Sequence, residues 1–336
     1  LRWVSTGNDS DPVSGIEAIE TSSYCSSPVT QNFFIAGSEL KSTVELTHAV
    51  AQPSGGADGT LSGKLVLSNS ESVSNSYLPF SGLAWSEVGV LRVNADTQAS
   101  YFGMNINQGY RDIGRFYPAW LSLISNNWNY SSNHDEFMYM GQPIAYDFVV
   151  EAQNMQGGAT TNYSSFSPSL IADVKLLSVN TSDDNSEFGS RVEDYDLHFW
   201  DGSSQWSGAQ LQVSDAPFQF NKLQTTSSPL ITRADGPYED GFGLRVTANS
   251  SGVKVDGVDF KTSEAPNLEL NSSGVTLDTG KPFSAQPDIR YGRMVLDDVG
   301  GTSTSTIYIP LRTEFWNGSR FIENEQDSGS TFASLG

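Results

Sequence analysis

Apolar and polar residues alternate along much of this chain, which is the pattern of half-buried β-strands. The alternation is strict in residues 43–47 and 65–67, and it recurs in residues 88–95 and 145–152. No stretch of a dozen residues keeps apolar positions at helical spacing without interruption by Gly, Pro or Ser. Further strands are predicted at residues 174–179, 197–200, 211–213, 218–223, 243–248, 293–296 and 306–315.

Turn-forming pairs separate these predicted strands. Asp-Gly occurs at residues 201–202 and 240–241, and Asn-Gly occurs at residues 317–318. Glycine in such pairs adopts the positive φ that tight hairpins require. Many short strands at intervals of about 8–12 residues are typical of sandwiches and barrels. We therefore predict an all-β protein built of tandem antiparallel β-sandwich modules of the immunoglobulin-like kind.

Two places along the chain suggest module boundaries. Residues 114–118 end in Pro118, which holds the preceding residue in extended geometry, and the strand spacing starts again after residues 260–266. We predict β-sandwich modules at residues 1–115 and 116–260, followed by a smaller β module at residues 261–336.

Charge and composition exclude several classes of function. The 336 residues carry 39 acidic and 18 basic side chains, which gives a formal net charge of −21. Nucleic-acid binding is not expected, because DNA and RNA are met by clustered Lys and Arg. No apolar run approaches 18 residues, so no membrane span is expected in this chain. Cys25 is the single cysteine and cannot form an internal disulfide, which favours an exported protein.

Histidine, the residue most often used in metal and acid–base sites, is scarce. The three are His48, His134 and His198, and no two stand at the spacing of metal ligands. His48 and His198 are predicted to be ordinary strand residues. His134 begins the sequence His-Asp-Glu, the one local cluster of a histidine with carboxylates, but zinc is not expected.

Acidic residues offer two further hypotheses. Asp183, Asp184 and Asp196 lie in segments rich in Ser, Asn and acid side chains, and loops with such oxygen ligands suit calcium. We name these three residues as candidate calcium ligands. An enzyme acting on polysaccharide would need two facing carboxylates, and acids within residues 183–196 could supply them. Adjacent acids are nevertheless expected in a chain of this composition, and we predict no catalytic residues.

A cluster of aromatic residues offers a binding hypothesis. Trp120, Trp128, Tyr130 and Tyr139 are interleaved with asparagines, and rings with nearby amides resemble the sugar-stacking platforms of carbohydrate-binding sandwiches. The alternative is that these rings belong to the ordinary sandwich core. Surface glycans are therefore candidate ligands.

Several motifs occur together and in a fixed order. The set comprises GTL at residues 59–61, FSGLAWSEVG at 80–89, IGRFYP at 113–118, YMGQP at 139–143, EAQNMQG at 151–157, TNY at 161–163, YGRMVL at 291–296 and IPLRTEFWNG at 309–318. This set resembles the uncharacterised C-terminal domain of MshQ-type proteins, which are encoded with the MSHA type IV pilus of Gram-negative bacteria. One departure is Gly329, because that family is expected to carry a Cys at this place, where it could partner Cys25.

The resemblance implies an exported protein at the cell surface, outside the cell or in the periplasm. We expect a non-enzymatic structural or interaction module that acts in adhesion or pilus assembly, with pilus or other surface proteins as partners. A glycan-recognising adhesin is the alternative, and a polysaccharide-active enzyme ranks below both. Trp85, Phe116, Tyr146, Phe148, Trp200, Phe220 and Trp316 are predicted to be core or interface anchors.

Overall fold

The computed structural model describes residues 19–28, 41–68, 71, 78–104, 106–134, 136–180, 188–202, 205–225, 227–248, 253–261, 268–269 and 279–331. In these ranges the chain is all-β, as predicted, and its helical segments are single short 3₁₀ turns. None of the described helices is long and apolar enough to cross a membrane.

The chain forms two compact units, and the second is interrupted by part of the first. The first unit contains residues 1–119 and 152–167, and the second contains residues 120–151 and 168–336. The three modules predicted at residues 1–115, 116–260 and 261–336 stay a prediction. Residues 152–167 belong to the first unit, although residues 120–151, which precede them directly, belong to the second.

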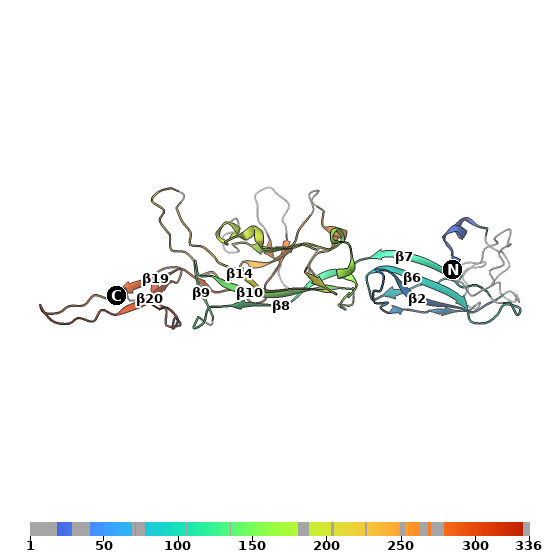
Figure 1. Ribbon diagram of the computed structural model, residues 1–336, viewed down its shortest axis with the longest axis horizontal. Coiled ribbons are helices and arrows are strands. Elements are labelled where there is room, and N and C mark those ends of the chain that lie inside the picture. Colours follow the sequence, from blue (N-terminus) through green and yellow to red (C-terminus); the bar gives the residue numbers. More distant parts are fainter. Residues whose placement is uncertain are drawn as a thin grey trace. The chain divides into compact units, whose positions relative to one another are not determined.

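The first unit is built on one five-stranded sheet in the order β1-β7-β6-β2-β4 (Figure 1). Its long strands, β2 (Val44–Gln52), β6 (Gly89–Thr97) and β7 (Gly109–Phe116), pair antiparallel. Val44 and Leu46 are buried and the intervening Glu45 is exposed, as strict alternation requires. Short strands complete the unit: β1 (Ile19–Glu20) and β4 (Val66–Leu67) in the sheet, and a separate pair of β3 (Leu61–Ser62) with β5 (Ala84–Trp85).

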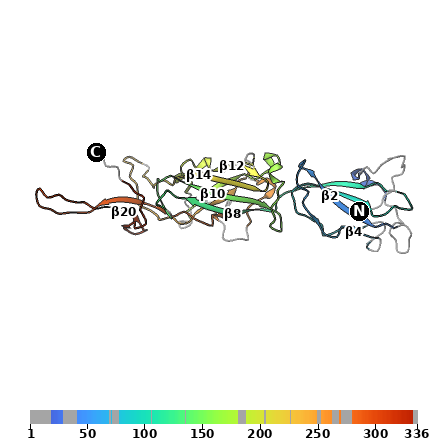
Figure 2. The same cartoon turned by 60° about the horizontal axis from the view of Figure 1, so that its bottom comes forward.

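The second unit is a sandwich of two sheets (Figures 1 and 2). One sheet has the order β13-β14-β10-β8, with β8 (Trp120–Asn129), β10 (Ile144–Gln153), β13 (Trp206–Ser207) and β14 (Gln210–Phe218). The other has the order β12-β11-β15-β17-β16, with β11 (Val174–Ser178), β12 (Phe199–Trp200), β15 (Phe242–Val246), β16 (Leu268–Glu269) and β17 (Thr279–Pro282).

Aromatic rings fill the space between these two sheets. Tyr146 and Phe148 project inward from β10, and the ring centroid of Phe148 lies 4.8 Å from that of Trp200 in the opposite sheet. Phe218 of β14 similarly meets Phe242 of β15 at 5.5 Å. Aromatic rings bury the largest apolar areas of any side chains, so these contacts supply much of the energy that holds the sheets together.

Two small sheets complete the second unit. β9 (Met138–Tyr139) pairs in parallel with β18 (Ile289–Arg290). β19 (Gly292–Leu296), β20 (Leu311–Trp316) and β21 (Phe321–Glu323) form an antiparallel sheet in that order.

Several sequence predictions need correction. β7 and most of β8 were not expected, because β7 has little buried surface and the asparagines in β8 obscure its alternation. Residues 306–310 and 219–223 are not strands, since the first belong to the exposed tip of the β19–β20 hairpin and the second contribute only an isolated bridge at Phe220.

The predicted core anchors divide into three groups. Tyr146, Phe148, Trp200 and Phe220 are buried, which confirms that prediction. Trp85 and Trp316 are half-buried, whereas Phe116 is 36% exposed at the end of β7 and is not a core residue. Phe116 instead packs against Trp85 with their ring centroids 5.4 Å apart.

Candidate functional site

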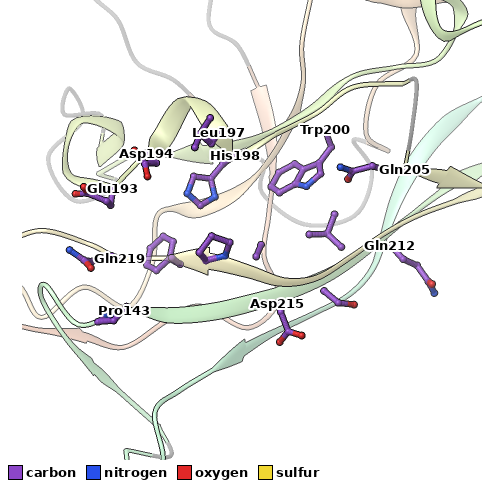
Figure 3. A pocket seen from close by; sticks show the side chains of 15 residues that line it. Pro143, Glu193, Asp194, Leu197, His198, Trp200, Gln205, Gln212, Asp215 and Gln219 are labelled. Carbon is purple, nitrogen blue, oxygen red and sulfur yellow. The ribbon is translucent and has the colours of Figure 1, made fainter.

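The second unit contains an open cleft of about 490 Å³ between strand β14 and residues 193–200 (Figure 3). His198 and Trp200 project over the strand from one side, and β14 forms the other (Figure 3). Volumes of this size are typical of sites for small molecules. The remaining lining residues include Pro143, Glu193, Asp194, Leu197, Gln205, Gln212, Asp215, Pro217 and Gln219.

A β-bulge shapes the β14 side of this cleft. In the β10–β14 ladder, Tyr146 pairs with Ala216 and Phe148 pairs with Val213, so Asp147 faces two residues of β14 instead of one. The side chain of Asp147 fastens the bulge, because it accepts the backbone N–H of Asp215 at 2.7 Å. Bulges are frequent beside binding and active sites, where they redirect a strand.

Two aspartates that line the cleft have backbones in the left-handed region. Asp194 has φ of 49° and Asp215 has φ of 54°. Asp tolerates this conformation better than most residues other than Gly and Asn, yet it remains uncommon. Such conformations concentrate at functional sites, so their occurrence on both sides of one cleft favours a role in binding.

His198 has a structural role in the cleft wall. Its Nδ1 atom lies 2.8 Å from the hydroxyl of Tyr146, and its ring is also hydrogen-bonded to the backbone of Glu193. Burial lowers the pKa of His198, against the opposing effect of the Glu193 bond, and burial raises the pKa of Tyr146 well above its ordinary value. A neutral imidazole therefore accepts a hydrogen bond from the Tyr146 hydroxyl at Nδ1 and carries its own proton on Nε2.

The polar groups of the cleft select against anions. Its lining supplies carboxylates from Glu193, Asp194 and Asp215, together with amides from Gln205 and Gln212, and includes no Lys or Arg among the described residues. Glu193 accepts a hydrogen bond from Asn221 at 2.8 Å, which orders one end of this rim. Amides and carboxylates beside an apolar surface suit a neutral polyhydroxylated ligand.

The aromatic residues predicted to bind glycans do not share one environment. Trp128 is buried among aromatic rings, including those of Tyr146 and Phe218 at 5.1 and 4.9 Å, so it is a core residue and offers no open face to a sugar. Trp120 lies eight residues away along β8, about 26 Å at the usual rise per residue. Its half-buried ring is covered by the Lys261 ammonium at 4.9 Å.

Tyr130 and Tyr139 are half-buried and hydrogen-bonded. The Tyr130 hydroxyl accepts the backbone N–H of Asp288 at 3.3 Å. The Tyr139 hydroxyl donates to Asp327 at 2.9 Å and accepts from Asn324 at 2.7 Å, and burial is the main cause that raises its pKa to about 12. Glycan binding through Trp120, Tyr130 and Tyr139 stays a prediction.

The candidate calcium ligands are only partly visible. Asp183 and Asp184 lie outside the described residues. The Asp196 side chain is exposed and lies 3.1 Å from the ammonium of Lys175. Within the described ranges, no group of three or more His, Cys, Asp or Glu side chains is arranged to hold a metal ion. Calcium binding by these three aspartates stays a prediction.

The sequence matches the third domain of DUF6701 over residues 87–274 and the fourth domain of DUF6701 over residues 290–335. The chain belongs to the DUF6701 family. No curated protein and no solved structure matches it.

One buried cluster joins the third and fourth DUF6701 domains of this chain. His134 donates from Nε2 to Asp327 at 2.8 Å, and its Nδ1 lies 3.1 Å from the Gln142 amide. Asp327 has a fully buried side chain, and it also accepts hydrogen bonds from Tyr139 and from the backbone and hydroxyl of Ser330. The sequence pointed to His134 but not to this partner, which lies 193 residues away.

The carboxylate of Glu87 connects two of the sequence motifs, at residues 80–89 and 161–163. Glu87, in the motif at residues 80–89, accepts the hydroxyl of Thr161 at 2.6 Å and the backbone N–H of Asn162 at 3.2 Å. Asn162 in turn donates to the carbonyl oxygen of Val88 at 3.2 Å. The side chain at Glu87 therefore holds residues 161–162 against the start of β6, which gives this motif pair a structural role.

Proposed function

We propose that this DUF6701 chain is a non-enzymatic surface or pilus-associated protein, exported by a Gram-negative bacterium, that acts in adhesion or pilus assembly as an interaction module. The proposal is supported by the resemblance of its ordered motifs to MshQ-type proteins. The main observation behind it is that the buried side chains best suited to acid–base chemistry have structural roles. His134, His198, Asp327 and Glu87 are held in internal hydrogen bonds that build the fold.

Surface labelling and attachment test this proposal together. An antibody against the chain should label intact producing cells as strongly as permeabilised cells. Deletion of the gene should reduce attachment of the cells to a surface, and restoration of the gene should return it. Labelling that requires permeabilisation, with unchanged attachment, would contradict the proposal.

Glycan recognition is the second candidate, and the cleft beside β14 favours it. The lining of amides, carboxylates and apolar surface suits a neutral saccharide and disfavours sialylated or sulfated ones. A glycan array of the whole chain should therefore show binding to neutral glycans only. If the folded chain bound no glycan on the array, glycan recognition would be excluded as its function.

Point variants connect any such binding to the cleft. Leu197 is 77% exposed at the cleft wall, so Leu197→Ser should weaken glycan binding about tenfold without unfolding the protein. Met155→Ser is the matched control, because Met155 is 76% exposed in the first unit. Equal affinity of both variants would place the binding site elsewhere.

A further inference from the structure

The β19–β20 hairpin, called the ribbon below, has one apolar face and one charged face. Met294 and Leu296 of β19 lie on one face and are 63% and 62% exposed, and Leu311 pairs with Leu296 on that face. The opposite face carries charges. Arg293 and Arg312 both contact Glu314, at 2.7 and 3.1 Å, and Arg312 also contacts Asp297. These four charges cancel one another, and Asp298 gives the hairpin (residues 292–316) a net charge of −1 in a chain of net charge −21.

β19 is the edge strand of its sheet. Among the described residues it pairs only with β20, and its residues 293–296 contain neither a bulge nor a proline. Natural edge strands are commonly protected by such features, because an open edge pairs with other strands. The start of this edge is covered, because Lys222 donates to the carbonyl oxygen of Gly292 at 3.3 Å.

The ladder fixes which backbone groups face outward. Asp297 donates its N–H to the carbonyl oxygen of Pro310 at 3.0 Å, and Trp316 donates to Tyr291 at 3.0 Å. Alternate residues of an antiparallel strand turn the same way, so the odd-numbered residues of β19 bond to β20. The N–H and C=O groups of Met294 and Leu296 therefore point away from the sheet.

We propose that β19 pairs antiparallel with β19 of a second copy of this chain, about a two-fold axis beside Val295. Met294 and the Leu296 of the other copy would then exchange both backbone hydrogen bonds. The two three-stranded sheets would join into one of six strands. This inference rests on the ribbon alone and is independent of the proposed function.

Charge complementarity favours a second copy of β19 as the partner strand, and it also determines the register of the pairing. With the axis at Val295, Arg293 faces the Asp297 of the other copy twice, and Met294 faces Leu296 twice. If the axis is shifted by one residue, to residue 294 or 296, the outward N–H and C=O groups can still pair. Arg293 then faces Val295 or Val299 of the other copy, and no acid lies opposite it. Strand β19 is thus complementary to itself in a single register, as a closed two-fold interface requires.

A pair of charge variants tests this register. Asp297→Lys places positive charges opposite Arg293, and Arg293→Glu places negative charges opposite Asp297. In sedimentation velocity each variant alone should dimerise at least tenfold more weakly than the natural chain, and an equimolar mixture should recover the dimer. Asp298→Lys is the matched control, since residue 298 faces Gly292 and should leave dimerisation unchanged. A monomeric natural chain, or no recovery in the mixture, would overturn the proposal.

Cysteine crosslinking gives a second readout that does not depend on ion pairs. In a Cys25→Ser background, Val295→Cys faces itself across the axis in a non-hydrogen-bonded pair, where Cα atoms lie about 4.5 Å apart and a disulfide can form. Mild oxidation should link this variant into dimers. Leu296→Cys, whose counterpart is displaced along the strand, should remain largely unlinked. Equal crosslinking of the two variants would overturn the proposed register.

Discussion

At the scale of single residues, Asp327 shows how a buried carboxylate is kept ionised. Burial alone would raise its pKa, but hydrogen bonds from Ser330, His134 and Tyr139 outweigh burial and hold the pKa well below its ordinary value. A carboxylate with this many donors is most stable in its charged form. Asp327 therefore contributes to the stability of the fold as an anion.

Replacement of this carboxylate should have a pH-dependent effect. Asp327→Asn should lower the free energy of unfolding by about 2 kcal/mol near neutral pH, because bonds to a charged acceptor are lost. The folded pKa lies below the unfolded value of about 3.9, so this contribution is complete above about pH 5 and is lost as the pH falls toward the folded pKa. Urea unfolding of the natural chain and of Asp327→Asn, at steps of about one pH unit between pH 3 and pH 7, measures the difference in their free energy of unfolding. A difference that does not shrink in acid would contradict this account.

His198 provides a second residue-scale prediction. Burial lowers the pKa of His198 and favours a neutral imidazole, and the hydrogen bond from its ring to the Glu193 backbone places the proton on Nε2, because Nδ1 faces Tyr146. Because burial disfavours the charged ring, His198 should titrate below the ordinary value of about 6.5. NMR of ¹⁵N-labelled histidine should show both the Nε2–H tautomer and this low titration. An Nδ1–H tautomer would contradict the assigned hydrogen bonds.

At the scale of elements, the bulge in β14 links strand pairing to the cleft. Asp147 accepts the N–H of Asp215 at 2.7 Å and the side-chain amide of Asn129 at 2.9 Å. One side chain thus connects the bulge to β8 on the other side of β10. The shape of the cleft wall depends on this carboxylate.

Substitution of Asp147 should lower the free energy of unfolding more than substitution of Asp215. Asp147→Ala should lower the free energy of unfolding by about 1–2 kcal/mol, because two polar groups lose their acceptor. Asp215→Gly should change it by less than about 0.5 kcal/mol, since its φ of 54° suits glycine. Chemical denaturation compares the two variants. An equal loss in both would mean that the Asp147 contacts do not hold the bulge.

At the scale of the whole molecule, the two compact units predict two unfolding transitions. Phe148→Ala should lower the transition of the second unit by about 3–5 kcal/mol, because it leaves a cavity beside Trp200 in the core. Glu87→Ala should lower only the transition of the first unit, where the donors at Thr161 and Asn162 lose their acceptor. Differential scanning calorimetry distinguishes them. A single transition that moves with both variants would show that the units unfold together.

The sequence by itself determined the fold class and much of the core. Alternation with a period of two sets which face of a strand is buried, so residues 145–152 predicted β10 and its inward Tyr146 and Phe148. The same reasoning failed at β7, whose residues are mostly exposed and therefore carry little periodic signal.

Only the tertiary structure decided which distant residues meet. The His134–Asp327 and Glu87–Thr161 bonds join residues 193 and 74 positions apart, and residues 152–167 join the first unit. The cleft depends on a bulge in one strand pair, and the register proposed for β19 depends on which backbone groups β20 leaves unpaired. Local patterns carry the periodicity of single strands, whereas such pairings depend on how complete strands pack together.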